Sequence, residues 1–336
     1  MTARARRGFV LAVAALAALF VAAQVVRSVE PLALDQALFA CFTRWVPRGL
    51  LPYRDLFDSK PPLFLYSYAL ARLLPGELVR SIWLLEALWL AATMGVAFAL
   101  ARRVWDRWAG LAAAALLFVA EWTPGWGGWW SRAQADEFAA LPLVAAALLA
   151  WRAVDAERLA LWAGVLTGVA GLFKIPSMAV AAAWPLTWLL VAGARPAVKR
   201  TAWMALGIAA PWALAAGWFA AHRAFGDFVD GVFVYHRYNA AYIAPPWSAV
   251  LPEFARTLAV AGALPLAAAA VGVACAARKE RIWLGAWIGT TTLAVALERQ
   301  LAGYQYLLAM PALAGAGGFG VAHVLRNRRT VAVGLA

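Results

Sequence analysis

Residues 79–101 read VRSIWLLEALWLAATMGVAFALA, and Arg102 and Arg103 follow directly. The stretch holds only two charged side chains, those of Arg80 and Glu86. A helix needs about 20 mostly apolar residues to cross the hydrocarbon core of a bilayer. This stretch therefore predicts a transmembrane helix with a basic end.

The composition of the whole chain agrees with this reading. Of 336 residues, 65% are hydrophobic and 14% are charged, with a net charge of +13. Soluble domains carry about 25% charged residues, so this chain has too few to cover a water-facing surface. Its basic residues lie between apolar runs and not on one soluble face, which argues against a nucleic-acid partner. Two cysteines are too few for a disulfide scaffold.

We expect an all-α polytopic membrane protein, with residues 1–336 forming one membrane-embedded unit and no soluble C-terminal domain. The first apolar stretch is too long for a typical signal peptide, so we interpret it as an uncleaved anchor. About ten transmembrane helices are predicted, over residues 8–27, 79–101, 109–121, 137–151, 159–173, 177–193, 202–221, 254–276, 282–297 and 304–324.

The segment Pro61–Leu74 is apolar but short, and it can be read as a span or as a helix in the membrane interface. Short cytoplasmic loops are enriched in Lys and Arg, which decides between the two readings. If Pro61–Leu74 is not a span, all the basic loops lie on the side of the N-terminus. We therefore predict a cytoplasmic (inner) membrane protein with both termini cytoplasmic and Pro61–Leu74 as an external juxtamembrane helix.

This topology gives three long external segments, residues 28–78, 122–136 and 222–253. The first contains LALDQALFACFTRWV, whose spacing predicts a helix lying on the membrane surface with Leu34 and Leu38 on one face. Asp35 falls in its first turns. An acid at that position is more often a partner of the helix dipole than a catalyst.

Further along the same segment, GLLPYRDLFDSKPPL (49–63) carries Asp55, Asp58 and Lys60. The two prolines predict a helix that starts directly after Lys60. A cation at a helix N-terminus is unfavourable unless an anion binds there. Lys60 could therefore bind an anionic ligand, or it could pair with Asp58 or Asp55.

Other polar residues lie at the external ends of the predicted spans. Arg132, Asp136 and Glu137 stand at the mouth of one span, where the acids could also act as helix caps. Lys174 ends the fifth span and could reach lipid headgroups or a phosphate. Arg299 and Tyr304 lie at the boundary of the last two spans.

Two further groups are less informative. Glu86 inside the second span must face the protein interior or form an ion pair, for which we expect Arg80 as the partner. His222 and His236 in the third external segment lack the spacing of a metal site.

The order of these parts resembles a known family. An acid follows the first span, GLLPYRDLFDSKPPL leads into a helix, an acidic pair opens a later span, GLFKIP follows, and Arg-x-x-x-x-Tyr precedes the last span. This is similar to the GT-C superfamily of integral-membrane glycosyltransferases, in the branch of protein O-mannosyltransferases and lipid A aminoarabinose transferases.

The resemblance implies a role for each matching residue. Asp35 matches an acid that acts as catalytic base or orients the acceptor, and Lys60 matches a lysine that contacts the donor phosphate. Asp136 and Glu137 match a second acidic motif across the cavity. Lys174 and Arg299 match basic positions near the lipid-phosphate entrance, and Tyr304 is a further candidate for binding the donor phosphate. The secondary site candidates are Asp55, Asp58 and Arg132.

The resemblance leaves metal dependence open. In some branches the second motif is Asp-x-Asp and binds a divalent metal, whereas this chain has Asp-Glu. Asp136 and Glu137 would be the ligands of such a metal, and no other cofactor is implied.

The predicted activity is the transfer of a sugar from a polyprenyl-phosphate donor to an acceptor hydroxyl on the external face, with inversion. The acceptor can be a lipid, a glycan or a protein, and membrane lipids surround the chain. The alternatives are a polytopic secondary transporter and an inactive lipid-binding membrane protein. Transporters place coupling charges near the midplane in paired repeats, whereas here the acids gather in external segments.

Overall fold

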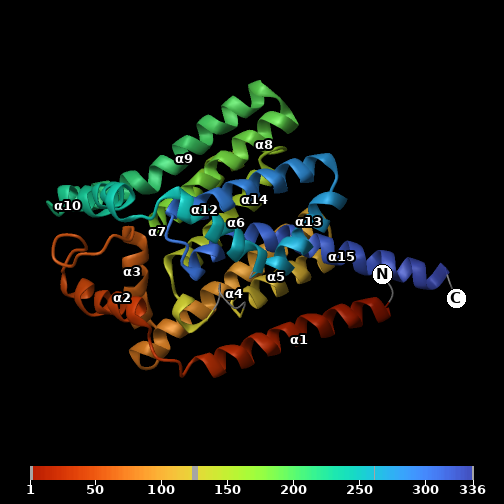
Figure 1. The fold of residues 1–336 in the computed structure, drawn as a ribbon, viewed down its shortest axis with the longest axis horizontal. Helices are drawn as coiled ribbons and strands as arrows, with labels where there is room; N and C mark the ends of the chain where they lie inside the picture. Colours follow the sequence, from red (N-terminus) through yellow and green to blue (C-terminus); the bar gives the residue numbers. More distant parts are fainter. Residues whose placement is uncertain (1–2, 123–127, 261, 335–336) are drawn as a thin grey trace.

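The structure, a computed structural model, describes residues 3–122, 128–260 and 262–334, and every regular element in these ranges is a helix (Figure 1). An all-α polytopic membrane fold is thus confirmed. The bundle consists of α1 (Ala3–Arg27), α4 (Leu78–Val104), α5 (Arg107–Ala120), α6 (Ala135–Arg152), α7 (Leu159–Phe173), η4 (Ile175–Ala182) with α8 (Ala183–Ala192), α9 (Ala194–Ala221), α12 (Trp247–Val260), α13 (Ala263–Cys275), α14 (Arg278–Glu298), and η7 (Gly303–Ala309) with α15 (Met310–Gly334).

Each of the ten predicted spans contains helix, but fewer of them qualify as spans by length and composition. In the described ranges, five helices are long and apolar enough to cross a membrane: Ala3–Arg27, Leu78–Val104, Ile175–Ala192, Ala194–Ala221 and Gly303–Asn327. The pair α12 and α13, bent by 81°, would make a sixth. The 15-residue α7 is shorter than a span, and the 18-residue α6 carries Asp136, Glu137 and Arg152. Both are largely buried inside the bundle, where protein covers them instead of lipid.

Small residues let the helices of the bundle approach one another closely. At Gly164 of α7, an added Cβ would lie 2.1 Å from the carbonyl oxygen of Met204 in α9. Gly207 of α9 meets α7 in the same way, with an added Cβ 2.1 Å from the carbonyl oxygen of Leu161. Helices in membranes associate through such small-residue contacts because lipid offers no hydrophobic drive between them.

The short helices α2 (Leu34–Trp45), α3 (Pro62–Leu70) and α10 (Phe225–Val229) lie together at one end of the bundle, and both termini lie at the other end (Figure 1). Leu34 and Leu38 of α2 are exposed, as expected for a surface helix. Phe39 packs on Phe64 of α3 with ring centroids 4.8 Å apart. The opposite face of α2 therefore anchors it to α3.

Residues 222–253, the third of the segments predicted to be external and here called the third polar segment, are helical but irregular. After α10 it continues as the π-helix η5 (Asp230–Val234), α11 (Tyr235–Tyr238) and a second π-helix, η6 (Asn239–Ile243). Single π-helical turns are rare and occur frequently at functional sites. The two π-helical turns lie in a segment that contributes to the wall of a cavity, described below.

Candidate functional site

A cavity of about 410 Å³ lies at the end of the bundle that carries α2 and α3, and residues from five separate parts of the chain line it. Five of the predicted site residues are among them: Asp35, Lys60, Lys174, Arg299 and Tyr304. The sequence prediction thus identified residues that are distant in the chain and adjacent in the structure.

Lys60 enters the cavity from the turn that precedes α3. Its backbone N–H donates to Asp58 Oδ1 (2.8 Å), and its carbonyl oxygen accepts from the Tyr53 hydroxyl (2.8 Å). Asp58 therefore binds the backbone of the turn and does not pair with the Lys60 ammonium. No acid of the described residues lies within 4 Å of the Lys60 ammonium.

The surroundings of Lys60 also favour loss of its proton. Burial, and then the positive charge of Lys174, lower the pKa of Lys60 from its ordinary value. Burial of a cation without a partner is unfavourable. An anion that enters the cavity would relieve this cost.

Lys174 is bound by two carboxylates. Its Nζ lies 3.1 Å from Asp136 Oδ2 and 2.6 Å from Glu298 Oε2, and all three residues are buried or nearly so. Burial lowers the pKa of Lys174, but the two acids outweigh burial and raise it well above its ordinary value. The charge of Lys174 is thus already neutralised by the protein.

Glu298 was not identified as a site residue from the sequence. It is the last residue of α14, lines the cavity and accepts a hydrogen bond from Gln305 Nε2 (2.5 Å). The signal available in the sequence was an acid at the end of an apolar run, directly before Arg299. Its partner Lys174 is too far away in the chain for that signal to be decisive.

The predicted acids have different surroundings. Asp35, in the first turn of α2, is partly exposed and faces the cavity. Asp136, fully buried in the first turn of α6, does not line the cavity and reaches it only through Lys174. Asp35 is therefore the carboxylate with direct access to a ligand.

Asp136 and Glu137 do not point to a common ligand. Asp136 faces Lys174, whereas Glu137 Oε2 accepts from the backbone N–H of Ala133 (2.7 Å). Neighbouring helical residues point about 100° apart, which explains the divergence. The pair is thus poorly suited to hold one metal ion.

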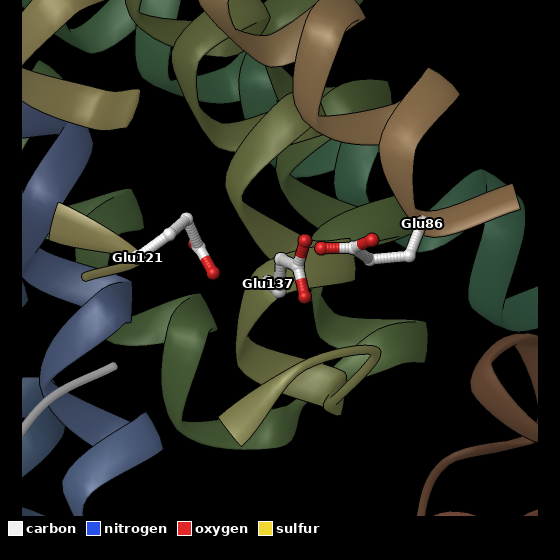
Figure 2. Close-up of side chains that lie close together, drawn as sticks. All are labelled: Glu86, Glu121 and Glu137. Atoms are coloured by element: carbon white, nitrogen blue, oxygen red, sulfur yellow. The ribbon is translucent and has the colours of Figure 1, made fainter. Parts of the chain in front are cut away.

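Glu137 instead converges with Glu86 and Glu121 (Figure 2), and one carboxylate oxygen of each lies within 4.8 Å of the others. A cavity of about 20 Å³, room for one water, borders Glu121 and Glu137. Each glutamate has one buried oxygen without a hydrogen-bond partner. The spacing would suit a small oxygen-coordinated cation or shared protons.

Arg132, and not Arg80 as predicted, is the ion-pair partner of Glu86. Its guanidinium donates to Glu86 Oε2 (2.7 Å), to Glu30 Oε2 (2.8 Å) and to the carbonyl oxygen of Arg27 (2.9 Å). Arg132 and the buried Arg27 supply two positive charges against the four glutamates 30, 86, 121 and 137. This network joins α1, α4 and the start of α6.

Arg299 uses its guanidinium on the protein backbone. It donates to the carbonyl oxygens of Ala240 (3.0 Å), Ala244 (3.2 Å) and Pro245 (2.9 Å), and its own φ is +60°. Tyr304, also in the cavity wall, has its ring 5.9 Å from Lys174 Nζ. Arg299 therefore holds the third polar segment over the cavity.

That segment contributes His236, to which the sequence assigned no role. His236 Nε2 lies 2.8 Å from the carbonyl oxygen of Ser59, and burial lowers the pKa of its imidazole. Tyr235 and Asn239 line the same wall. Residues 235, 236 and 239 share one face of a helical turn, as their spacing allows, but the sequence does not reveal that this face packs over Ser59.

The secondary candidates Asp55, Asp58 and Arg132 do not line the cavity. Asp55 forms an exposed pair with Arg54 and accepts the N–H of Leu51 (2.8 Å), so it shapes the loop. Its pKa is lowered, mainly by the hydrogen bond from Arg54.

Comparison with known proteins agrees with this geometry. Residues 59–218 match the family model of dolichyl-phosphate-mannose-protein mannosyltransferases. The fold is similar to that of ArnT from Cupriavidus metallidurans bound to undecaprenyl phosphate, with a TM-score of 0.64 and 18% identity over 90% of this chain and 59% of that one. The apo state of the same ArnT gives a TM-score of 0.65 and 19% identity, over 92% and 60%.

The chain spans about 60% of the length of these solved structures. A search of curated proteins finds no match. The resemblance to the GT-C superfamily is confirmed by the family-model match and the shared fold.

Proposed function

We propose that this chain, a membrane protein of the GT-C superfamily, transfers a sugar from a polyprenyl-phosphate donor to an acceptor hydroxyl. One observation carries the proposal: Asp35 and Lys60 line the same cavity, and none of the described acids lies within 4 Å of the Lys60 ammonium. The ArnT of similar fold was solved with undecaprenyl phosphate bound, which supports a donor of that chemical class.

In the proposed reaction Asp35 acts as general base. As the acceptor oxygen attacks the anomeric carbon, Asp35 takes the hydroxyl proton, and the bond between that carbon and the phosphate oxygen breaks. The electron pair of that bond leaves with the polyprenyl phosphate. A direct attack of this kind inverts the anomeric configuration.

Lys60 stabilises the departing phosphate. Among the described residues no acid lies within 4 Å of its ammonium, so it can interact with the negative charge that develops on the leaving oxygen. Lys174 also lines the cavity, but its ion pairs with Asp136 and Glu298 occupy its ammonium and fix its position in the wall. In this scheme Lys174 positions the wall and Lys60 contacts the donor.

We further propose that the cavity faces the outside of the cytoplasmic membrane and that both termini are cytoplasmic. The two termini lie at the end of the bundle away from α2 and α3, which supports a shared side (Figure 1). The basic loops predicted on the side of the N-terminus support a cytoplasmic position of that side, because short cytoplasmic loops are enriched in Lys and Arg. A reporter fused after Arg107 is expected to be cytoplasmic, and an external reporter would overturn this topology.

The test of the activity uses purified protein and a labelled polyprenyl-phosphate sugar. Asp35→Asn should bind the donor with unchanged affinity and release no polyprenyl phosphate when acceptor is added. Asp55→Asn is the matched control, because Asp55 is a carboxylate of the same segment outside the cavity. Full turnover by Asp35→Asn would refute the assignment, and uptake of label into vesicles without release would favour a secondary transporter.

A further inference from the structure

A second charged depression lies at the other end of α2 from Asp35. Arg44 at the end of α2, Arg48 and Arg72 line an open groove of about 510 Å³, together with Leu74, Gly76, Leu78 and Ser81. We refer to these seven residues as the arginine groove. Nine residues of helix separate Asp35 from Arg44, which corresponds to about 14 Å. The arginine groove is therefore distinct from the cavity of the proposed reaction.

The three guanidinium groups are held close together by neutral partners. Arg48 Nη1 donates to the carbonyl oxygen of Arg44 (2.8 Å), and Arg72 Nη1 donates to that of Thr43 (3.1 Å). Arg44 and Arg48 both lie over the ring of Trp45, at 5.1 and 5.3 Å. Within the described ranges none of the three forms an ion pair.

Three like charges in one groove repel one another, and no acid lines the groove to offset them. Glu77 is exposed at the start of α4 between two lining residues, and it is not paired with any of the arginines. Guanidinium groups bind phosphate oxygens through paired N–H donors. The groove is thus built to attract an anion.

The position of the groove in the fold indicates where that anion comes from. Leu78 and Ser81 belong to the first turn of α4, which is one of the helices able to cross a membrane. A residue at the start of a span lies at the depth of the lipid headgroups. Leu70 and Leu73, on the adjoining turn, are 51% and 81% exposed and give the groove an apolar border.

We propose that the arginine groove binds the phosphate of an anionic membrane lipid, with the acyl chains lying along the exposed leucines beside it. A phosphate free in solution would gain nothing from that apolar border. The lipid is one of net negative headgroup, such as phosphatidylglycerol, because three cations without an acid disfavour the choline cation of a zwitterionic headgroup.

The experiment is a titration of the purified full-length chain in detergent, with bound lipid counted by native mass spectrometry. Phosphatidylglycerol should bind at least about ten-fold more tightly than phosphatidylcholine with the same acyl chains. Because a basic side chain near an anionic membrane surface contributes about 1 kcal/mol, Arg72→Gln should weaken phosphatidylglycerol binding about five-fold. The triple variant Arg44→Gln/Arg48→Gln/Arg72→Gln should lose the preference.

Two controls separate this site from general charge effects and from the cavity. Arg54→Gln removes one charge from an exposed arginine of the same segment that is already paired with Asp55, and it should leave binding unchanged. Lys60→Gln should also leave phosphatidylglycerol binding unchanged. All the arginines replaced are exposed, so thermal unfolding of each variant should match that of the parent chain.

Three results would overturn the proposal. One is equal affinity for the two lipids, and another is a triple variant that keeps its preference. The third is displacement of phosphatidylglycerol by millimolar glycerol phosphate, which would identify a site for a soluble anion. None of these measurements depends on sugar transfer, so the proposed reaction can fail or succeed independently.

Discussion

Replacing each of the two lysines of the cavity by glutamine should have opposite consequences. Lys174→Gln leaves the buried carboxylates of Asp136 and Glu298 without their shared cation. Removing one partner of a buried ion pair costs about 3–5 kcal/mol, so this variant should unfold at a clearly lower temperature. Lys60 has no acidic partner within 4 Å in the described structure, so Lys60→Gln should keep or slightly raise the stability.

Donor binding should show the reverse order of effects. A hydrogen bond to a charged group contributes about 1.5–3 kcal/mol, so Lys60→Gln should weaken binding of the polyprenyl-phosphate sugar donor by about 10- to 150-fold. The measurements are thermal unfolding in detergent and a titration with the polyprenyl-phosphate sugar in the absence of acceptor. The double variant Lys174→Gln/Glu298→Gln should recover part of the lost stability, with a coupling of about 0.5–3 kcal/mol.

The reasoning is refuted if Lys174→Gln unfolds like the parent chain while its donor affinity falls as far as that of Lys60→Gln. Lys174 would then be free to contact the phosphate, as the sequence predicted. Absence of any recovery in the double variant would contradict the ion pair with Glu298.

Three other predictions address the buried glutamates, the third polar segment and pH. If Glu86, Glu121 and Glu137 share protons, Glu121→Gln should unfold at the same or a higher temperature, and a chelator should have no effect. Arg132→Gln should lose about 3–5 kcal/mol of stability, because Glu86 remains buried and unpaired. A lower unfolding temperature of the parent chain in chelator would instead indicate a bound cation. Gly231→Ala places a Cβ 2.4 Å from the ring of Tyr53, so this variant should lose about 1–3 kcal/mol of stability and turn over more slowly. Gly226→Ala is the control, because an added Cβ there meets no atom within 4 Å. An equal loss in the control would contradict the role of the contact with Tyr53. The pKa of Lys60 is lowered, and its charged form binds the phosphate. Donor affinity should therefore fall as the pH rises through a pKa below the ordinary 10.5, and Lys60→Arg should remove that fall because arginine stays charged. A pH profile unaffected by Lys60→Arg would contradict this role of Lys60.

The membrane fold could be predicted because it depends on local properties. Hydropathy located helix in every predicted span, and the proline pair correctly placed the start of α3. The number of spans was harder to predict, because α7 is shorter than a full span and α6 begins with two acids. Neighbouring helices bury much of both, and hydropathy does not reveal this cover.

The site residues too could be predicted where they belong to a local sequence pattern and not where their partners are distant in the chain. Lys60 and Asp35 belong to a segment with a specific pattern, and both line the cavity. The ion pair between Arg132 and Glu86 joins residues 46 positions apart, and sequence proximity led to Arg80 instead. The family resemblance assigned Arg299 to the phosphate, and the sequence could not reveal its carbonyl partners because they become its neighbours only in the folded chain.

The way the cavity uses its cations determines which of them can accelerate the proposed reaction. Lys174 is neutralised by two acids and Arg299 donates to three carbonyl groups, so both are bound before a donor arrives. A sugar phosphodiester carries one negative charge, whereas the departing phosphate monoester approaches two near pH 7. Only an interaction that strengthens as this charge develops raises the rate of the chemical step. Lys60 meets that condition, because no acid of the described residues lies within 4 Å to compete for its charge as the phosphate departs. Lys60→Gln should therefore lower kcat/KM by more than it lowers donor affinity, and an equal loss in both would reduce its role to binding.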